Sequence, residues 1–356
     1  MRVLVTGGAG FIGSAVVRRM LSDPATVAVV VVDKLTYAGH RVNLTQVEGN
    51  PRYAFVQADI VDGAAMAAVF DEHQPDSVMH LAAESHVDRS IDGPRPAVET
   101  NVLGTFTLLE AARAYWGQMK GERRDRFRFH HVSTDEVFGS LGPEGVFTEA
   151  STYDPRSPYS ASKAGSDHLV RAWHHTYGLP VVVSNTCNNY GPRQYPEKLI
   201  PVLIGRALTG ERLPIYGSGT NVRDWIFVED HAEALIAILQ RGRAGESYNV
   251  GARAERTNNQ VVELVCRMLD ELIPQSTHRP HRQLIEYVAD RPGHDQRYAI
   301  DPSKVERELG WRPKVSFEQG LRMTVEWYIS NQEWCRVVTR DRYDGGRLGV
   351  TAGYRR

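Results

Sequence analysis

The chain has 356 residues, a formal net charge of −1 and 42% hydrophobic residues, an ordinary balance for a globular protein of one large or two modest domains. This balance of charge disfavours nucleic acid or an anionic membrane as a partner. The three cysteines lie far apart in no metal-binding pattern, so we expect reduced thiols, no metal site and a cytoplasmic location. We also expect no membrane span, because the apolar runs are too short.

The chain opens with a predicted strand at residues 2–6, a glycine-rich turn and a helix that starts at Ser14. The turn has a GxxGxxG spacing, formed by Gly7, Gly10 and Gly13. Such glycines let the backbone approach a pyrophosphate at the positive end of a helix. A second predicted strand, residues 27–32, leads into Asp33, and a carboxylate about 20 residues after the turn binds the adenosine ribose and disfavours a 2′-phosphate. These features predict an NAD site.

Two further predicted strands, residues 53–57 and 76–80, flank a crossover helix around residues 64–70, which indicates a parallel sheet. Asp59 then meets the adenine, and the small residues Ala82 and Ala83 let the cofactor lie close. Downstream, apolar residues at helical spacing predict a helix over 94–115. The polar stretch 120–126 predicts an exposed loop, and a strand is expected at 127–132.

Thr134, Asp135 and Glu136 follow that strand, at the sheet edge where α/β enzymes keep their chemistry. Two adjacent carboxylates repel each other and are costly to bury as anions. Burial should therefore raise one pKa and leave one proton donor beside one proton acceptor. The alternative interpretation is a pair of solvated loop charges.

Tyr159 and Lys163 are four residues apart at the start of a helix predicted over 158–178, so they share one face. An ammonium group near a phenol lowers the phenol pKa, and such a tyrosine can take a proton from a sugar hydroxyl. A chance surface pair is the alternative. His86, in the polar segment after the 76–80 strand, is interpreted as a substrate contact, with an ordinary loop histidine as the alternative.

This order of motifs resembles the extended short-chain dehydrogenase/reductases, and the Thr134-Asp135-Glu136 triplet resembles the nucleotide-sugar 4,6-dehydratases of the dTDP-glucose type. Related 4-epimerases share the glycines and the Tyr-x-x-x-Lys pair but generally lack the Asp-Glu pair. Further blocks similar to the family cover residues 81–90, 158–163, 188–192 and 196–201. Cys187 departs from the family pattern and places a thiol near the pocket.

The resemblance implies an α/β fold, with a Rossmann-type doubly wound parallel sheet and a smaller C-terminal substrate-binding domain. The NAD-binding domain is expected at 1–187 plus about 222–254, and the nucleotide-sugar-binding domain at about 188–221 plus 255–345. Residues 346–356 form a tail. The family also implies a homodimer through the helices at 94–115 and 158–178.

The implied reaction converts dTDP-glucose into dTDP-4-keto-6-deoxyglucose and water with bound NAD. The resemblance implies that Tyr159, assisted by Lys163 and Thr134, removes the proton of the C4 hydroxyl. It implies that Glu136 is the base that removes the C5 proton, and that Asp135 is the acid at the C6 hydroxyl. The implied cofactor residues are Gly7, Gly10, Phe11, Ile12, Gly13, Asp33, Lys34, Leu35, Thr36, Asp59, Ile60, Leu81, Ala82, Ala83, Ser85, Thr100, Tyr159, Lys163 and Asn189. The implied substrate residues are Ser85, His86, Thr134, Asn188, Glu197, Lys198, Leu199, Pro214, Tyr216, Arg223, Asn258, Asp290, Arg291 and His294.

Three hypotheses stay open at this point: the 4,6-dehydratase, a nucleotide-sugar 4-epimerase, and a non-catalytic NAD-binding protein. The intact set of Thr134, Asp135, Glu136, Tyr159 and Lys163 favours the first, because binding alone does not require all five. The choice between thymine and uracil leaves no motif, since one methyl group is worth only about 1–3 kcal/mol in a pocket.

Overall fold

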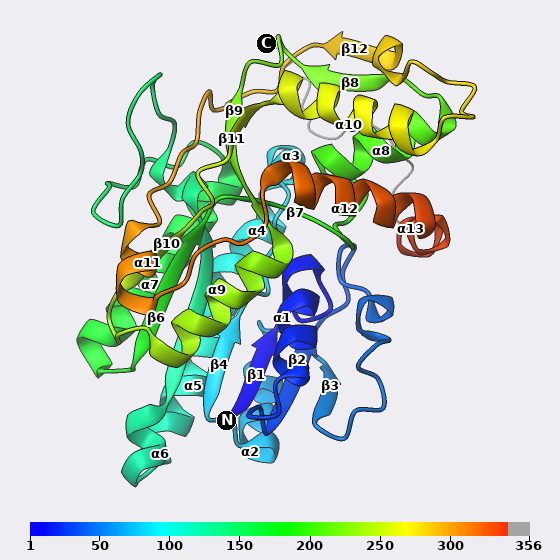
Figure 1. Cartoon of the computed structure of the whole chain (residues 1–356). Coiled ribbons are helices and arrows are strands. Elements are labelled where there is room, and N and C mark those ends of the chain that lie inside the picture. The colour runs from blue at the N-terminus through cyan, green and yellow to red at the C-terminus, as the bar shows by residue number, and fades with distance from the viewer. Residues whose placement is uncertain (341–356) are drawn as a thin grey trace.

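Seven parallel strands form the central sheet, in the order β10-β6-β5-β4-β1-β2-β3 (Figure 1). The structure is a computed structural model that describes residues 1–340. The strands are β1 (Arg2–Thr6), β2 (Ala28–Asp33), β3 (Tyr53–Gln57), β4 (Ser77–His80), β5 (Arg128–Thr134), β6 (Val181–Thr186) and β10 (Ser247–Val250). The strand order reverses between β1 and β4. This arrangement confirms the predicted Rossmann-type α/β class.

Helices cover both faces of this sheet. Val3 and Val5 of β1 point to one face and pack with α1 (Phe11–Ser22) and α9 (Val228–Arg241). Leu4 points to the other face, which α2 (Gly63–His73), α5 (Thr105–Gln118) and α7 (Pro158–Tyr177) cover. This alternation follows from the two-residue period of a strand, and burial on both faces explains the continuous apolar runs in β1 and β2.

Two predicted elements differ from the structure in type, and two others differ in their bounds: α1 begins at Phe11 rather than at Ser14, and β5 extends to Thr134 rather than ending at residue 132. Residues 121–126, predicted as a loop, form the short helix α6 (Gly121–Arg126), in which Glu122 and Arg126 pair at 3.2 Å one turn apart. The helix predicted over 94–115 is divided into α4 (Arg95–Ala97), a π-helical segment η2 (Val98–Gly104) and α5. In η2 the side chain of Asn101 binds the backbone of Glu84, a tertiary constraint that helical periodicity does not reveal.

A smaller second layer of structure lies above the sheet in Figure 1. It contains a three-stranded sheet and a two-stranded sheet: β7 (Asn188–Tyr190), β9 (Val222–Phe227) and β11 (Glu255–Thr257), then β8 (Leu213–Tyr216) and β12 (Ile285–Val288). Its helices are α8 (Leu199–Thr209), α10 (Asn258–Leu272), α12 (Phe317–Ser330) and α13 (Gln332–Thr339). The short elements α3 (Val87–Asp92), η1 (Arg41–Leu44), η3 (Asp135–Phe138), η4 (His281–Leu284) and α11 (Ser303–Leu309) complete the described chain.

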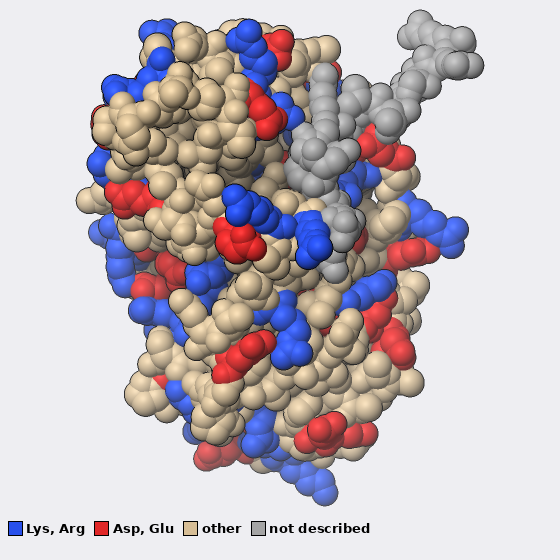
Figure 2. Space-filling model, turned by 90° about the vertical axis from the view of Figure 1, so that its right-hand side faces the viewer, with Lys and Arg blue, Asp and Glu red and all other residues tan. Residues whose placement is uncertain are grey.

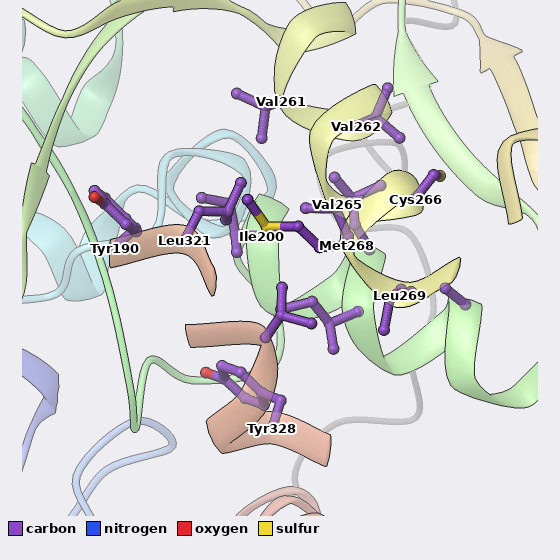
Figure 3. Close-up of a cluster of buried hydrophobic side chains, with 14 of the residues drawn as sticks. Tyr190, Ile200, Val261, Val262, Val265, Cys266, Met268, Leu269, Leu321 and Tyr328 are labelled. Carbon is purple, nitrogen blue, oxygen red and sulfur yellow. The ribbon is translucent and has the colours of Figure 1, made fainter. Parts of the chain in front are cut away.

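This smaller part has its own core. Val261 and Val265 of α10 belong to one buried cluster with Ile200 of α8 and Leu321 of α12 (Figure 3). In chain order, the backbone leaves the large sheet after β6, forms β7, α8, β8 and β9 of the smaller part, and returns to the large sheet with α9 and β10. Strand β9, at the predicted boundary near residue 222, pairs with β7 and β11 of the smaller part, and the exact domain boundaries stay a prediction.

Acidic and basic side chains are interspersed over the face shown in Figure 2, without a large area of one sign. Within residues 1–340, no helix is long and apolar enough to span a membrane. The predicted tail at 346–356 lies outside the described residues.

Candidate active site

A cavity of about 310 Å³ lies at the carboxyl ends of the central strands, next to the reversal of strand order. Open α/β sheets bind their ligands at this position. Of the predicted cofactor residues, all except Leu35 line the cavity. Of the predicted catalytic residues, all five line it: Thr134, Asp135, Glu136, Tyr159 and Lys163.

The glycine turn provides a close-fitting cradle in this cavity. A Cβ atom on Gly13 would lie 2.2 Å from the carbonyl oxygen of Gly7, and Gly7 itself has a φ of +70°. Gly10 caps α1 without a side-chain hydrogen bond, so the first N–H groups of the helix have no side-chain partner. This bare, positive helix end fits the pyrophosphate of a dinucleotide.

Asp33 ties the end of β2 to this turn. Its two oxygens accept hydrogen bonds from the backbone N–H groups of Ala9 and Leu35, at 2.9 and 2.8 Å. Leu35 therefore supports Asp33 through its backbone N–H and does not itself line the cavity. Lys34 pairs with Asp59 at 2.6 Å across the same edge of the cavity.

The two adjacent carboxyl groups lie in different environments. Asp135 is 1% exposed, and its pKa is raised well above the usual value by burial and by the charges of Glu136 and Asp224. Burial also raises the pKa of Glu136, but the nearby cations Arg291, Arg223 and Lys198 oppose this effect. The pair thus combines a carboxyl group that favours its protonated form with one that has cationic support for its ionised form.

Thr134, at the end of β5, joins the pair to the neighbouring tyrosine. Its hydroxyl oxygen accepts a hydrogen bond from the backbone N–H of Glu136 at 3.2 Å and lies 3.4 Å from the carboxylate of Asp135. A hydrogen bond between Thr134 and Tyr159 favours the phenolate. The side chains of Asp135 and Tyr159 and the backbone N–H of Glu136 therefore meet at one hydroxyl group.

Helix α7 presents Tyr159 and Lys163 to the cavity from its first turns. Ser157 caps the helix in a reciprocal capping box, and Pro158 occupies the first helical position. Burial lowers the pKa of Lys163 to about 8, and its ammonium group donates a hydrogen bond to the carbonyl oxygen of Val132 at 2.9 Å. The pKa of Tyr159 is raised by burial and by the adjacent acid pair, so the lowering expected from sequence is wrong for the chain by itself.

The predicted substrate residues fall into two groups. Ser85, Thr134, Asn188, Glu197 and Lys198 line the cavity. The others lie outside its lining: His86, Leu199, Pro214, Tyr216, Arg223, Asn258, Asp290, Arg291 and His294.

Several members of this outer group are joined to one another and to α3. Arg291 pairs with Asp88 at 2.6 Å, and the Tyr216 hydroxyl donates to the same carboxylate at 3.3 Å. His294 lies 2.6 Å from Asp290. His86 is buried, with its pKa lowered to about 2 by burial and nearby cations, so its imidazole is neutral.

The structure also brings unpredicted residues to the site. Asp167 and His131 lie beneath Lys163, and Asp224 raises the pKa of Asp135. Asp167 lies four residues after Lys163, so helical spacing could have indicated it. Cys187 does line the cavity, but burial raises the pKa of its thiol well above the usual value and keeps it protonated.

Comparisons with known proteins agree with this geometry. The family model described as GDP-mannose 4,6 dehydratase matches residues 4–324. The dTDP-glucose 4,6-dehydratase 1 of Escherichia coli is 56% identical over 352 residues, which cover 96% of this chain and 97% of that protein. A crystal structure of dTDP-glucose 4,6-dehydratase from Streptomyces venezuelae with NAD bound is 48% identical, with a TM-score of 0.86, and covers 95% of this chain and all of that one.

An enzyme of a different activity has a similar fold. The UDP-glucose 4-epimerase of Thermotoga maritima is 32% identical, with a TM-score of 0.81, over 93% of this chain and 100% of that chain. The fold alone therefore does not distinguish the two activities, and the residues of the site must do so.

Proposed function

The chain belongs to the dTDP-glucose 4,6-dehydratase family, and on this premise we propose that it converts dTDP-glucose into dTDP-4-keto-6-deoxyglucose and water with NAD as cofactor. The observation that carries this proposal is the pair Asp135 and Glu136. The elimination of water needs a proton donor beside a proton acceptor. The raised pKa of Asp135 suits it as the donor, and the cations that act on Glu136 suit it as the acceptor.

The residues present fit NAD. The glycine cradle and the open end of α1 suit the pyrophosphate, and Asp33 supplies the carboxylate for the adenosine ribose. The cavity continues from there to Tyr159 and Lys163. Bound NAD supplies hydride chemistry, as acceptor of the C4 hydride and later as its donor to C6. With NAD bound, the positive charge of its oxidised form would favour the phenolate of Tyr159.

The chain's own residues move the protons. Tyr159 takes the proton of the C4 hydroxyl, supported by the Thr134 hydroxyl and the Lys163 ammonium. The resulting C4 ketone acidifies the C5 proton, which Glu136 removes. Asp135 protonates the C6 hydroxyl, so that this group leaves as water, and Glu136 then returns a proton to C5. Each positioned acid or base of this kind contributes about 10²–10⁴ in rate.

The diphosphate is assigned to Arg223 and Arg291, because planar guanidinium groups bind phosphate oxygens with two hydrogen bonds. Both arginines act electrostatically on Glu136, which supports a position next to the reacting sugar. The remaining assigned contacts to sugar and nucleotide are Ser85, His86, Thr134, Asn188, Glu197, Lys198, Leu199, Pro214, Tyr216, Asn258, Asp290 and His294.

The test is to incubate the purified protein with dTDP-glucose without adding NAD. We expect a 4-keto sugar product whose mass shows the loss of one water, and Glu136→Gln should lower its rate of formation by about 10²–10⁴. Glu72→Gln is the control, because the Glu72 side chain is 77% exposed on α2. If neither dTDP-glucose nor UDP-glucose loses water even with added NAD, the dehydratase is excluded, and a galactosyl product would instead identify a 4-epimerase.

The proposal includes a homodimer formed through α5 and α7. Val98, Leu103 and Phe106 are large apolar residues with more than a third of their surface exposed on η2 and α5. Phe106 contacts Trp173 of α7 edge to face, so the apolar surface extends across both helices. A cytoplasmic location is also proposed, supported by the three free cysteines.

A further inference from the structure

A carboxylate without exposed surface lies one helical turn beyond Lys163. Asp167 shares a face of α7 with Tyr159 and Lys163, because residues four apart lie above one another on a helix. No step of the proposed reaction uses it. A charge this deeply buried is costly unless it has partners or a role.

Four polar groups surround the Asp167 carboxylate. Ser133 and Tyr153 each donate a hydroxyl hydrogen bond at 2.8 Å, and the amide of Asn185 donates one at 3.2 Å. The Nε2 atom of His131 lies 3.1 Å from the other carboxylate oxygen. Burial acts to raise the pKa of Asp167, but the contact with His131, the charge of Lys163 and the Ser133 hydrogen bond outweigh it. Asp167 is therefore an anion.

His131 separates this anion from Lys163. Its Nε2 atom is also 3.4 Å from the Lys163 nitrogen, whereas its Nδ1 atom is buried without a partner. A proton on Nε2, which lies 3.2 Å from the Ser166 hydroxyl oxygen and 3.1 Å from the Asp167 carboxylate, leaves only an acceptor unpaired at Nδ1, and this costs less than a buried unpaired N–H. Burial and the charge of Lys163 lower the pKa of His131 to about 4, so the imidazole stays neutral. The carboxylate and the ammonium thus act on each other across an uncharged ring.

Among the groups that residues 1–340 place around Lys163, Asp167 is the one whose negative charge raises the pKa of Lys163. Tyr159 lies on the same helix, while β5 contributes His131 and the carbonyl oxygen of Val132. From β4, His80 faces Lys163 and is neutral, because burial lowers its pKa. Burial favours the uncharged amine, and Asp167 opposes that loss of charge.

We propose that Asp167 is a positioning residue of the dehydratase, which acts across His131 to keep Lys163 in its charged ammonium form at neutral and mildly alkaline pH. This inference rests on the proposed function, since the ammonium matters because it supports the Tyr159 phenolate during C4 oxidation. Lys163 touches the reacting region, whereas Asp167 acts only through Lys163.

The experiment isolates the oxidation step. In an Asp135→Asn background the titration of Asp135 is absent, and the rate of cofactor reduction after mixing with dTDP-glucose is measured against pH. Adding Asp167→Asn should move the alkaline limb of this profile to lower pH by about 1 unit, since an opposite charge at this range shifts a pKa by that order. Tyr153→Phe is the control, because it removes one hydrogen bond to Asp167 but keeps the charge, and the limb should stay in place.

An unchanged alkaline limb in a folded Asp167→Asn protein would overturn the inference, even if its rate fell uniformly. Asp167→Glu retains the charge, so its limb should match that of Asp167 itself. If Asp167→Asn does not fold, the pH profile of Asp167→Glu is measured instead. An alkaline limb at lower pH in Asp167→Glu, which keeps the negative charge, would contradict the inference. Failure of the proposed function is distinct, since the wild-type protein then forms no keto product from dTDP-glucose.

Discussion

At the scale of single residues, chemically identical groups are made different by their surroundings. Asp135 and Glu136 are adjacent carboxyl groups, yet two acids and one arginine act on Asp135, while three cations and one acid act on Glu136. Asp224 takes part in this division. It is 1% exposed and binds the backbone N–H of Ala254 at 2.7 Å, while its second oxygen is buried without a partner. Asp224 therefore favours the protonated form of Asp135, but its own burial with an unpaired oxygen is unfavourable for stability.

This arrangement predicts a pH-dependent cost in stability. Burial raises the pKa of Asp224 from 3.8 to about 6 in the folded protein. The folded state thus binds a proton more tightly than the unfolded state, and the free energy of unfolding falls as pH rises from about 4 through about 6. In Asp224→Asn this loss is absent, because asparagine does not titrate. The melting temperature of the variant relative to wild type should therefore rise between about pH 4.5 and about pH 7, and a constant difference would contradict the assignment.

At the scale of elements, the β1–turn–α1 unit depends on backbone contact. Gly13, in the first turn of α1, has no room for a side chain, because its Cβ would lie 2.2 Å from the carbonyl oxygen of Gly7. By contrast, Gly117 near the end of α5 has no atom within 4 Å of its Cβ position. Gly13 is therefore required by close backbone packing, whereas Gly117 has space for a side chain.

Gly13→Ala should displace the turn from the end of α1, cost about 1–3 kcal/mol of stability and release most of the bound NAD. Gly117→Ala should leave NAD in place and change the stability by no more than about 1 kcal/mol, in the stabilising direction. The measurements are the melting temperature and the NAD content of the purified proteins. Full NAD content in the Gly13 variant would show that the turn does not hold the cofactor.

At the scale of the whole molecule, two parts with separate cores enclose the cavity, and α13 binds back to the larger part. The indole N–H of Trp334 donates to the side chain of Asn43 in η1 at 2.9 Å. On the outside, the apolar residues of η2 and α5 stay exposed in one chain. A second copy of the chain is the partner that we propose for this surface.

Phe106→Arg should therefore convert a dimer, of twice the 39.9 kDa chain mass, into a monomer, because a charge placed in an apolar interface is costly to bury. Val27→Arg is the matched control, since Val27 is 57% exposed directly before β2 and belongs to none of η2, α5 and α7. Sedimentation velocity of both variants checks the result. A monomeric wild type, or a dimer that survives Phe106→Arg, would exclude this interface.

The sequence by itself determined the elements whose signal is local. Strand β3 has the predicted bounds, and β2 and β4 agree to within one residue, because apolar runs between turns carry their own pattern. The glycine spacing and the Tyr-x-x-x-Lys pair are also local, which is why Gly13, Tyr159 and Lys163 could be assigned to one site before the fold was known.

Only the tertiary structure decided what depends on residues far apart in the chain. The division of a predicted helix at η2 follows from the contact between Asn101 and Glu84, and the raised pKa of Tyr159 follows from its burial beside the acid pair. The different environments of Asp135 and Glu136 likewise come from β9 and from the loop that carries Arg291. Burial and electrostatic interactions are summed over the folded molecule, so no single stretch of sequence contains them.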